Sequence, residues 1–308
     1  MKRAWKVSLI VALVLFICGA CFVTAGAALN DWNFQTVREK NPRQKTYDAS
    51  GDEISKLRID IDAAEVQVTE SEDEDIHVTY WESDWVSFDV TEKNGKLTIH
   101  ERRKPWWMNF GVNIGRNEKR AFSIEIPRGY DGEFHLDVAL GSVTVSDLET
   151  EASFSAALSA GSLQITNCTF SSLKVNDSLG DVRLYSCNIE QLSCDLSAGK
   201  FAAEDLTVER DIDIDLSLGD LNMENSRVNG AVRIDSSAGD VDLWHVEVGG
   251  SLTIDLSLGN VYALLSGDGY YFSRCETSLG SVKTPNLKGD KVPIRIDNSA
   301  GDITVEVE

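Results

Sequence analysis

Residues 212–241 read IDIDLSLGDLNMENSRVNGAVRIDSSAGDV, a stretch that contains one ten-residue pattern twice, at 212–221 and 232–241. In each copy apolar and polar residues alternate before a glycine, which is followed by an aspartate and an aliphatic residue. A fixed period near 20 residues is typical of a solenoid, in which each repeat forms one coil. The glycine recurs every 19 to 21 residues in the C-terminal part of the chain, at Gly141, Gly161, Gly180, Gly199, Gly219, Gly239, Gly259, Gly280 and Gly301.

Aligning the repeats on this glycine turns each position into a column. The columns seven and five residues before the glycine and two residues after it are apolar in nearly every repeat, with polar residues between them. This alternation predicts short strands with one face inward. The column directly before the glycine holds only leucine and alanine, and we expect it to point inward as well. Its members are Leu140, Ala160, Leu179, Ala198, Leu218, Ala238, Leu258, Leu279 and Ala300.

The sequence therefore predicts an all-β protein, a parallel β-solenoid whose coils of about 20 residues follow one another in chain order. The nine glycines are interpreted as structural corners, because glycine tolerates the backbone of a tight β-arc. The alternation of leucine and alanine leaves a second geometry open, in which a full turn takes about 40 residues. Two strands in every 20 residues favour the shorter coil.

A worn copy of the repeat precedes the regular array at 57–68, with Ala64 in place of the glycine. Degenerate terminal repeats are typical of solenoid caps. The sequence thus divides into a cytoplasmic tip and anchor at 1–29, a linker at 30–53, an N-terminal cap region at 54–130 and the regular solenoid at 131–308.

An uncharged apolar segment occupies residues 7–29, after Lys2, Arg3 and Lys6. As a helix it would be about 35 Å long, enough to span a bilayer. The preceding cations favour a cytoplasmic N-terminus. We therefore expect a single-pass transmembrane helix with the solenoid outside the cytoplasm. A cleaved signal peptide ending near Ala25-Gly26-Ala27 is the alternative, although its apolar region would normally be shorter.

The chain is strongly acidic, with a net charge of −21, which excludes nucleic acid as a default partner. One column, four residues before the glycine, contains an acidic ladder that we interpret as a solvated edge or as a docking surface for cations. One carboxylate and one serine per coil fall short of the six to eight oxygens that calcium takes, so no metal site is predicted. The ladder comprises Asp195, Asp215, Asp235, Asp255, Glu276 and Asp297.

A basic aromatic loop at 102–110 interrupts the acidic chain. Two interpretations stay open: these side chains plug the open end of the solenoid, or they contact lipid or a partner, since tryptophan and basic residues favour membrane interfaces. The residues concerned are Arg102, Arg103, Lys104, Trp106, Trp107, Met108 and Phe110.

Sequence motifs for catalysis or cofactor binding are missing from the chain. Its four histidines show no metal-ligand spacing, and we predict no enzyme, cofactor or metal. A polysaccharide-cleaving β-helix is a distant alternative. Its catalytic acid and base would be two carboxyl groups in different environments, whereas a repeating ladder gives every carboxyl group a similar one. Cys168, Cys187, Cys194 and Cys275 occupy apolar columns and are expected to be small buried hydrophobes, with a Cys168–Cys187 bridge left open.

The first strand LRIDI at 57–61, the segment IPRG at 126–129 and the units SLGDV at 178–182 and SAGDV at 237–241 carry a resemblance. Together with the N-terminal apolar segment they resemble the bacterial putative adhesin family, a domain of unknown function that includes LiaG-like proteins of Gram-positive envelope-stress operons. The resemblance covers about 54–308. It implies a non-catalytic envelope module for binding or scaffolding, linked to envelope-stress sensing, with an envelope protein, lipid or wall polymer as partner. A surface adhesin is the alternative.

Overall fold

The computed structural model describes residues 42–104 and 121–308. The predicted anchor and Trp106, Trp107, Met108 and Phe110 of the basic aromatic loop lie outside the described residues. In the described part, no helix is long and apolar enough to cross a membrane. The chain forms two units: the solenoid unit, made of 44–80, 88–101 and 120–308, and a second unit made of 1–43, 81–87 and 102–119.

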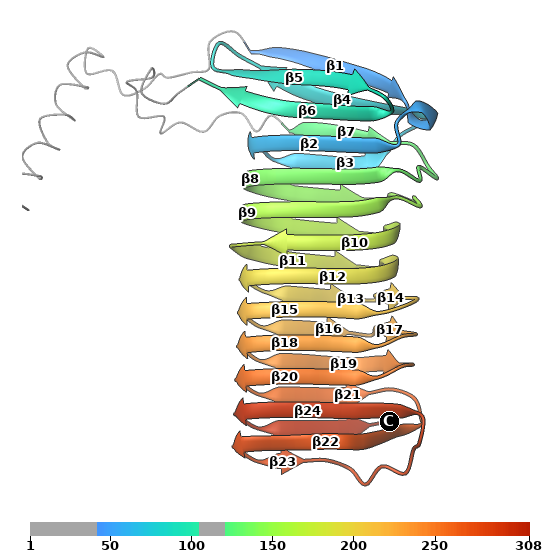
Figure 1. The fold of residues 1–308 in the computed structure, drawn as a ribbon, viewed down its shortest axis with the longest axis vertical. Helices are drawn as coiled ribbons and strands as arrows, with labels where there is room; N and C mark the ends of the chain where they lie inside the picture. Colours follow the sequence, from blue (N-terminus) through green and yellow to red (C-terminus); the bar gives the residue numbers. More distant parts are fainter. Residues whose placement is uncertain (1–41, 105–120) are drawn as a thin grey trace, which may run out of the picture. The chain divides into compact units, whose positions relative to one another are not determined.

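The solenoid unit is almost entirely β-structure, and its strands run side by side in a continuous stack (Figure 1). The N-terminal elements are β1 (Arg43–Ser50), the 3-10 helix η1 (Gly51–Glu53), β2 (Lys56–Ala63), β3 (Val66–Glu70), β4 (Asp75–Glu82), β5 (Val86–Lys93), β6 (Lys96–Arg103) and β7 (Phe122–Ile126). The stack continues with β8 (Glu133–Ser146), β9 (Ser153–Thr166), β10 (Thr169–Asp177), β11 (Gly180–Tyr185), β12 (Asn188–Ala198), β13 (Phe201–Glu204), β14 (Thr207–Val208), β15 (Ile212–Leu218), β16 (Leu221–Glu224) and β17 (Arg227–Val228). It ends with β18 (Val232–Ala238), β19 (Val241–Val248), β20 (Leu252–Leu258), β21 (Val261–Leu265), β22 (Tyr270–Leu279), β23 (Val282–Lys283), β24 (Val292–Ala300) and β25 (Ile303–Val307).

Strand register establishes the 20-residue coil. Cys194 of β12 pairs with Ile214 of β15, and Ile214 pairs with Ile234 of β18, all in parallel. Residues of one column therefore lie directly above one another, as the alignment on glycine predicts. The alternative of a 40-residue turn is wrong, because adjacent repeats in this region pair with each other.

The interior consists of stacked apolar columns. The rings of Phe134 and Phe154 are parallel within 12° and lie 4.7 Å apart, and the Phe170 ring packs against Phe154 from a neighbouring column at 5.4 Å. The three apolar columns used to predict the fold are buried in almost every coil. Parallel pairing places like side chains at strand spacing, so each coil buries its apolar face against the next.

The last two repeats do not stack in chain order. The final coil, β24–β25, pairs with β20 and β21 on one side and with β22 and β23 on the other. The coil that contains Gly280 therefore ends the stack, and the C-terminal coil is inserted before it (Figure 1). The expectation of consecutive stacking is wrong at this one position.

The column directly before the glycine does not point inward. Leu140, Leu179, Leu218 and Leu258 are 58–61% exposed, and Leu279 is 74% exposed. The prediction of an inward column is wrong because the residues two and one before the glycine both face solvent. Inward alternation stops at the residue three before the glycine, where the arc begins.

Each corner glycine touches the corner of the preceding coil in space. A Cβ on Gly219 would lie 1.6 Å from the carbonyl oxygen of Gly199, and the φ of Gly219 is 140°. A Cβ at each corner would meet the corner of the coil on its N-terminal side. Ala64 is tolerated because it belongs to the first coil, β2–β3, which has no such corner before it. Close backbone approach therefore requires glycine at each corner, and the dihedral angle requires it at every corner except Gly180.

A second corner follows six residues after the glycine. It consists of residues in the left-handed region with φ between 48° and 55°: Asp147, Asn167, Ser186, Asp205, Asn225 and His245. Asparagine and aspartate tolerate this conformation better than other residues with a Cβ. The sequence alignment contained this polar column, but its role as a second corner was missed.

Candidate functional site

The exposed column before the glycine forms a continuous apolar ridge on the solenoid unit. We call it the Leu/Ala ridge, and in spatial order it comprises Ala63, Leu140, Ala160, Leu179, Ala198, Leu218, Ala238, Leu258, Ala300 and Leu279. In the chain the alternation fails at Leu258 and Leu279, which follow one another. Insertion of the last coil restores it, since Ala300 lies between them in space. Leucines therefore project from every second coil, about 9.6 Å apart, with an alanine notch between each pair.

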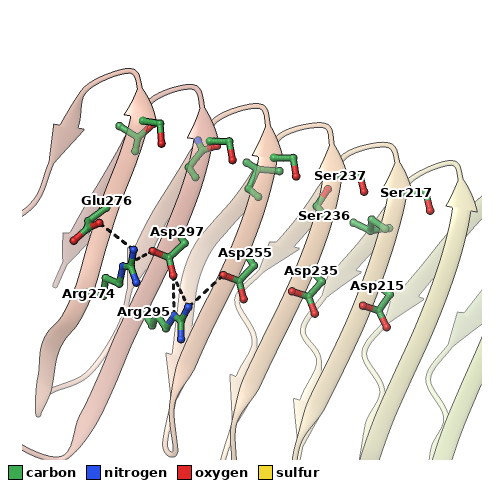
Figure 2. Close-up of a pocket in the computed structure, with 17 residues that line it drawn as sticks. Asp215, Ser217, Asp235, Ser236, Ser237, Asp255, Arg274, Glu276, Arg295 and Asp297 are labelled. Carbon is green, nitrogen blue, oxygen red and sulfur yellow. Dashed lines mark hydrogen bonds and ion pairs between the residues drawn. The ribbon is translucent and has the colours of Figure 1, made fainter.

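The acidic ladder runs parallel to the ridge, three residues or about 10 Å away along each strand. Figure 2 shows Asp215, Asp235, Asp255 and Asp297 in one row with Glu276 at its end. Together with the neighbouring serines these residues line a shallow groove of about 660 Å³. Asp195 lies in register with Asp215 and continues the row toward the N-terminus. The structure thus brings the six predicted ladder residues together on one face.

Arginines neutralise the C-terminal half of the ladder. Arg295 lies 2.7 Å from Asp297 and 3.9 Å from Asp255, and Arg274 lies 2.6 Å from Asp297 (Figure 2). Among the described residues, Asp195 and Asp215 have no ion-pair partner. Burial, followed by repulsion from neighbouring aspartates, raises the pKa of Asp215. The negative charge is therefore least compensated at the N-terminal end of the ladder, at Asp195 and Asp215.

A second polar row, directly after the glycine, is structural. In each case a carboxylate or amide oxygen accepts a hydrogen bond from a backbone N–H of the next coil. The pairs are Lys200 N to Asp181 Oδ1 at 3.0 Å, Asp240 N to Asp220 Oδ1 at 3.3 Å, Asn260 N to Asp240 Oδ1 at 2.7 Å, Asp302 N to Asn260 Oδ1 at 3.0 Å and Ser281 N to Asp302 Oδ1 at 2.8 Å. The row follows the spatial order of the coils and stabilises the glycine corner.

No three His, Cys, Asp or Glu side chains gather into a metal site in the ranges 42–104 and 121–308. The carboxylates of the ladder are spread one per coil, so no two coils supply the oxygen set that a calcium ion takes. The row of carboxylates can attract a cationic surface.

A family match covers most of this fold. Residues 54–306 match Toastrack DUF4097. The chain belongs to the Toastrack DUF4097 family. The resemblance to a bacterial adhesin-like family is thereby confirmed, and the Toastrack domain contains both the Leu/Ala ridge and the acidic ladder. No curated protein matches the chain.

Solved structures with low identity resemble the Toastrack domain over most of its length. A putative cell adhesion protein from Clostridium sporogenes ATCC 15579 is 12% identical, with 87% of this chain and 100% of that chain covered and a TM-score of 0.26. A putative adhesin from Parabacteroides distasonis ATCC 8503 is 13% identical, with 86% and 98% covered and a TM-score of 0.45. A putative adhesin from Parabacteroides merdae ATCC 43184 is 14% identical, with 87% and 98% covered and a TM-score of 0.41.

At its N-terminal end the Toastrack domain has an aromatic cluster of its own. The Tyr80 ring lies 4.7 Å from Phe88 and 6.2 Å from Phe122, and the two phenylalanine rings are 5.6 Å apart. In the second unit, the Lys104 ammonium lies 5.7 Å from the centre of the Trp85 ring. Whether Trp106 and Trp107 plug the solenoid or bind a partner stays a prediction.

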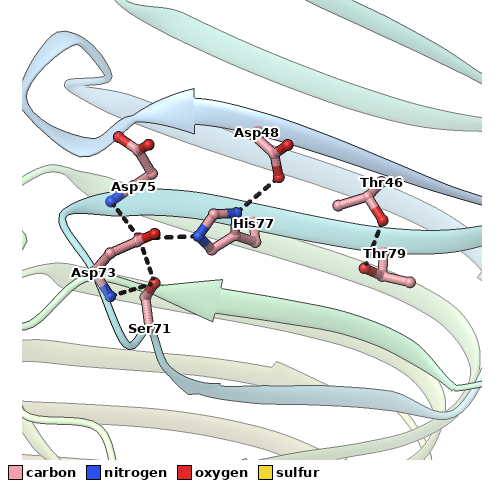
Figure 3. Close-up of polar contacts among 7 residues, drawn as sticks. All are labelled: Thr46, Asp48, Ser71, Asp73, Asp75, His77 and Thr79. Carbon is pink, nitrogen blue, oxygen red and sulfur yellow. Dashed lines mark hydrogen bonds and ion pairs between the residues drawn. The ribbon is translucent and has the colours of Figure 1, made fainter.

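His77 on β4 bridges two carboxylates that sequence reasoning missed (Figure 3). Its Nδ1 lies 2.7 Å from Asp48 on β1, and its Nε2 lies 2.9 Å from Asp73. Both partners only accept hydrogen bonds, so both ring nitrogens donate when the imidazole is protonated. These two bonds raise the pKa of His77 above its ordinary value. The contact joins β1 to the rest of the cap.

All four described cysteines are free thiols, and Cys168, Cys187 and Cys194 are buried as predicted. Burial raises the pKa of Cys168 to about 12 and that of Cys275 to about 11. Cys275 is only half-buried, because it lies on β22 in the coil that ends the stack. The thiols therefore act as small hydrophobes, and a Cys168–Cys187 bridge is not formed in this structure.

Proposed function

We propose that this protein is a non-catalytic, adhesin-type binding module at the bacterial cell envelope, with the Leu/Ala ridge and its acidic flank as the binding face. One observation carries the proposal: five leucines that are each at least 58% exposed form one line on the surface of the solenoid unit. Contiguous exposed apolar surface of this kind marks interaction sites. A fold of stacked coils presents such a line without loops that would enclose a substrate.

The family and the similar solved structures support this proposal. Three of the similar solved structures are described as a putative cell adhesion protein or putative adhesins. The predicted single-pass anchor at 7–29 would hold the module close to the membrane, with an envelope protein, lipid or wall polymer within reach. A role in envelope-stress sensing rests on the resemblance to LiaG-like proteins and stays a prediction.

Photocrosslinking in intact cells tests the binding face. A photoreactive amino acid replaces Leu218 in the full chain, and a matched variant has it at Arg227, an exposed residue of β17 in the same coil. We expect a discrete adduct from position 218 and none from position 227. Accessibility of a C-terminal epitope tag to protease in intact cells tests the outside location. Equal labelling from both positions, or no adduct from either, would contradict the proposed face.

A further inference from the structure

We infer that the Leu/Ala ridge binds a cationic amphipathic α-helix of a partner protein, whose apolar side chains sit in the alanine notches. The inference rests on the proposed binding function and names the partner class for that face. Three features of the ridge carry it: the spacing of the notches, the charge on both sides, and the distribution of the charge along the stack.

The spacing favours a helix. Successive notches lie about 9.6 Å apart, because each spans two coils. Residues seven apart on an α-helix are about 10.5 Å apart, and a helix inclined by about 20°, as in helix–helix packing, projects them to about 9.9 Å. Side chains on one face of an extended strand recur every ~6.8 Å and fall out of step with the notches.

A polyproline II segment also has a suitable repeat, of about 9.3 Å, but its backbone has no internal hydrogen bonds. Over a line of leucines these polar groups would lose water without gaining a partner, which is costly. A helix satisfies its backbone internally and presents an apolar stripe bordered by polar residues. The ridge, an apolar line between two polar rows, is the complement of that stripe.

The charge on both sides requires a cationic partner. The columns four before and one after the corner glycines contain eleven carboxylates and a single lysine, Lys200. A second copy of this chain is disfavoured, because antiparallel ridges would bring the acidic ladder of each copy against itself. Parallel ridges would oppose the ladder with the second acidic row. An anionic membrane surface is disfavoured for the same reason.

The distribution of charge places the binding footprint. Toward the C-terminal end Arg233 pairs with Asp235, and Arg274 and Arg295 both pair with Asp297. Asp195 and Asp215 lie beside Ala198 and Leu218, where no described cation pairs with them. We therefore centre the helix on the coils between Leu179 and Leu258, which offer two complete notches, at Ala198 and Ala238.

Binding of a designed peptide tests the inference. The probe is a three-heptad helix with leucine at the first and fourth positions of each heptad and lysine on either side of this stripe. Two matched peptides accompany it, one with the same composition in scrambled order and one with glutamate for lysine. The full chain in a neutral detergent is titrated with each peptide, and the signal from empty micelles is subtracted.

We expect the heptad peptide to bind at least tenfold more tightly than either matched peptide. Raising the salt to about 0.5 M should weaken it at least tenfold, since screening shortens the range of exposed charges. The triple variant L179S/L218S/L258S should bind the heptad peptide at least tenfold more weakly. Its melting temperature should stay unchanged, because these side chains are exposed. The matched variant A198L/A238L fills both notches and should also bind the heptad peptide at least tenfold more weakly, although it adds apolar surface.

Equal or tighter binding by A198L/A238L would overturn the inference, because a mere hydrophobic patch would gain from the added leucines. Equal binding of the scrambled or the glutamate peptide would overturn it too. An adduct from position 218 in cells without specific binding of the heptad peptide would leave the proposed function standing and remove the helix as its partner.

Discussion

Leu258 of β20 pairs in register with Ala300 of β24, although Leu279 precedes Ala300 in the chain. The exchange of the last two coils keeps large and small side chains alternating along the ridge. It also continues the backbone-to-side-chain ladder from Asp240 through Asn260 to Asp302. A regular order would place two leucines at strand spacing on the exposed face.

Cysteine crosslinking distinguishes the two orders. Thr253 is in register with Arg295, which in turn is in register with Arg274. With Cys275 replaced by serine, the pair T253C/R295C should oxidise readily, because neighbouring strands place Cα atoms within disulfide range. The matched pair T253C/R274C should stay reduced. A bond in the second pair, identified by mass spectrometry of linked peptides, would establish consecutive stacking instead.

Substituting a corner glycine should be costly. We expect G219A to lower the free energy of unfolding by about 3 kcal/mol, since the backbone is strained for alanine and the new Cβ meets the carbonyl oxygen of Gly199. The matched change A64G in the first coil should cost less than about 1 kcal/mol, from backbone entropy alone. Chemical denaturation of the two variants measures both values, and similar losses would refute the stacking explanation.

Asp177 occupies an inward column and is expected to destabilise the fold at neutral pH. Its Oδ1 accepts a hydrogen bond from Leu179 N at 3.0 Å, and burial raises its pKa. Asn298, in the same column, makes the equivalent bond to Ala300 N at 3.1 Å and also donates to the Gly259 carbonyl at 2.9 Å. An ionised carboxylate cannot donate in this way.

The variant D177N should therefore be more stable than the natural chain by about 1 kcal/mol at pH 7, which is the typical net contribution of one buried hydrogen bond. Because the pKa of Asp177 is higher in the folded state, the natural chain gains stability as pH falls through that value. The advantage of D177N should shrink toward pH 4. Thermal melts of both proteins between pH 4 and pH 8 measure the difference, and an advantage that does not vary with pH would contradict this account.

The bridge from His77 to Asp48 and Asp73 predicts a pH dependence of the same sign, in a range set by the histidine. The pKa of His77 is higher in the folded state than in the unfolded state, where it is about 6.5. The stability that His77 contributes is therefore fully present below about pH 6.5 and is lost as pH rises through the folded-state pKa. The melting temperature should fall with rising pH above about 6.5 in the natural chain and less in H77N. Parallel curves for the two proteins would show that His77 contributes no pH-dependent stability.

Thiol reactivity should separate the four described cysteines. In the native protein Cys275 should react first with a thiol reagent, because it is half-buried in the end coil. Cys168, Cys187 and Cys194 should react only after denaturation, since burial raises each pKa and limits access. Mass spectrometry of the modified peptides at short times measures the order of reaction. In the C275S variant the fast-reacting thiol should be missing.

Most of the fold was predictable because a solenoid repeats one local solution. The apolar column that contains Ile214 and Ile234 predicted which side of each strand faces inward, and the glycines predicted the position of each corner. The prediction failed for Leu218, where strict alternation was extended through a corner that breaks it. The acidic ladder was predicted as a row, whereas the bridge at His77 was missed because Asp48 lies far from Asp73 and His77 in the chain and the three residues belong to no repeated column.

The sequence alone determined the period, the strand faces and the identity of the corner residues, since each depends on neighbours within one coil or on a column repeated in every coil. Only the tertiary structure decided that Leu218 and its equivalents face solvent, because that depends on the path of the backbone around the arc. It alone also decided that Ala300 lies between Leu258 and Leu279. Two coils with the same inward pattern can exchange places at little cost to the core, so only contacts between coils choose their order.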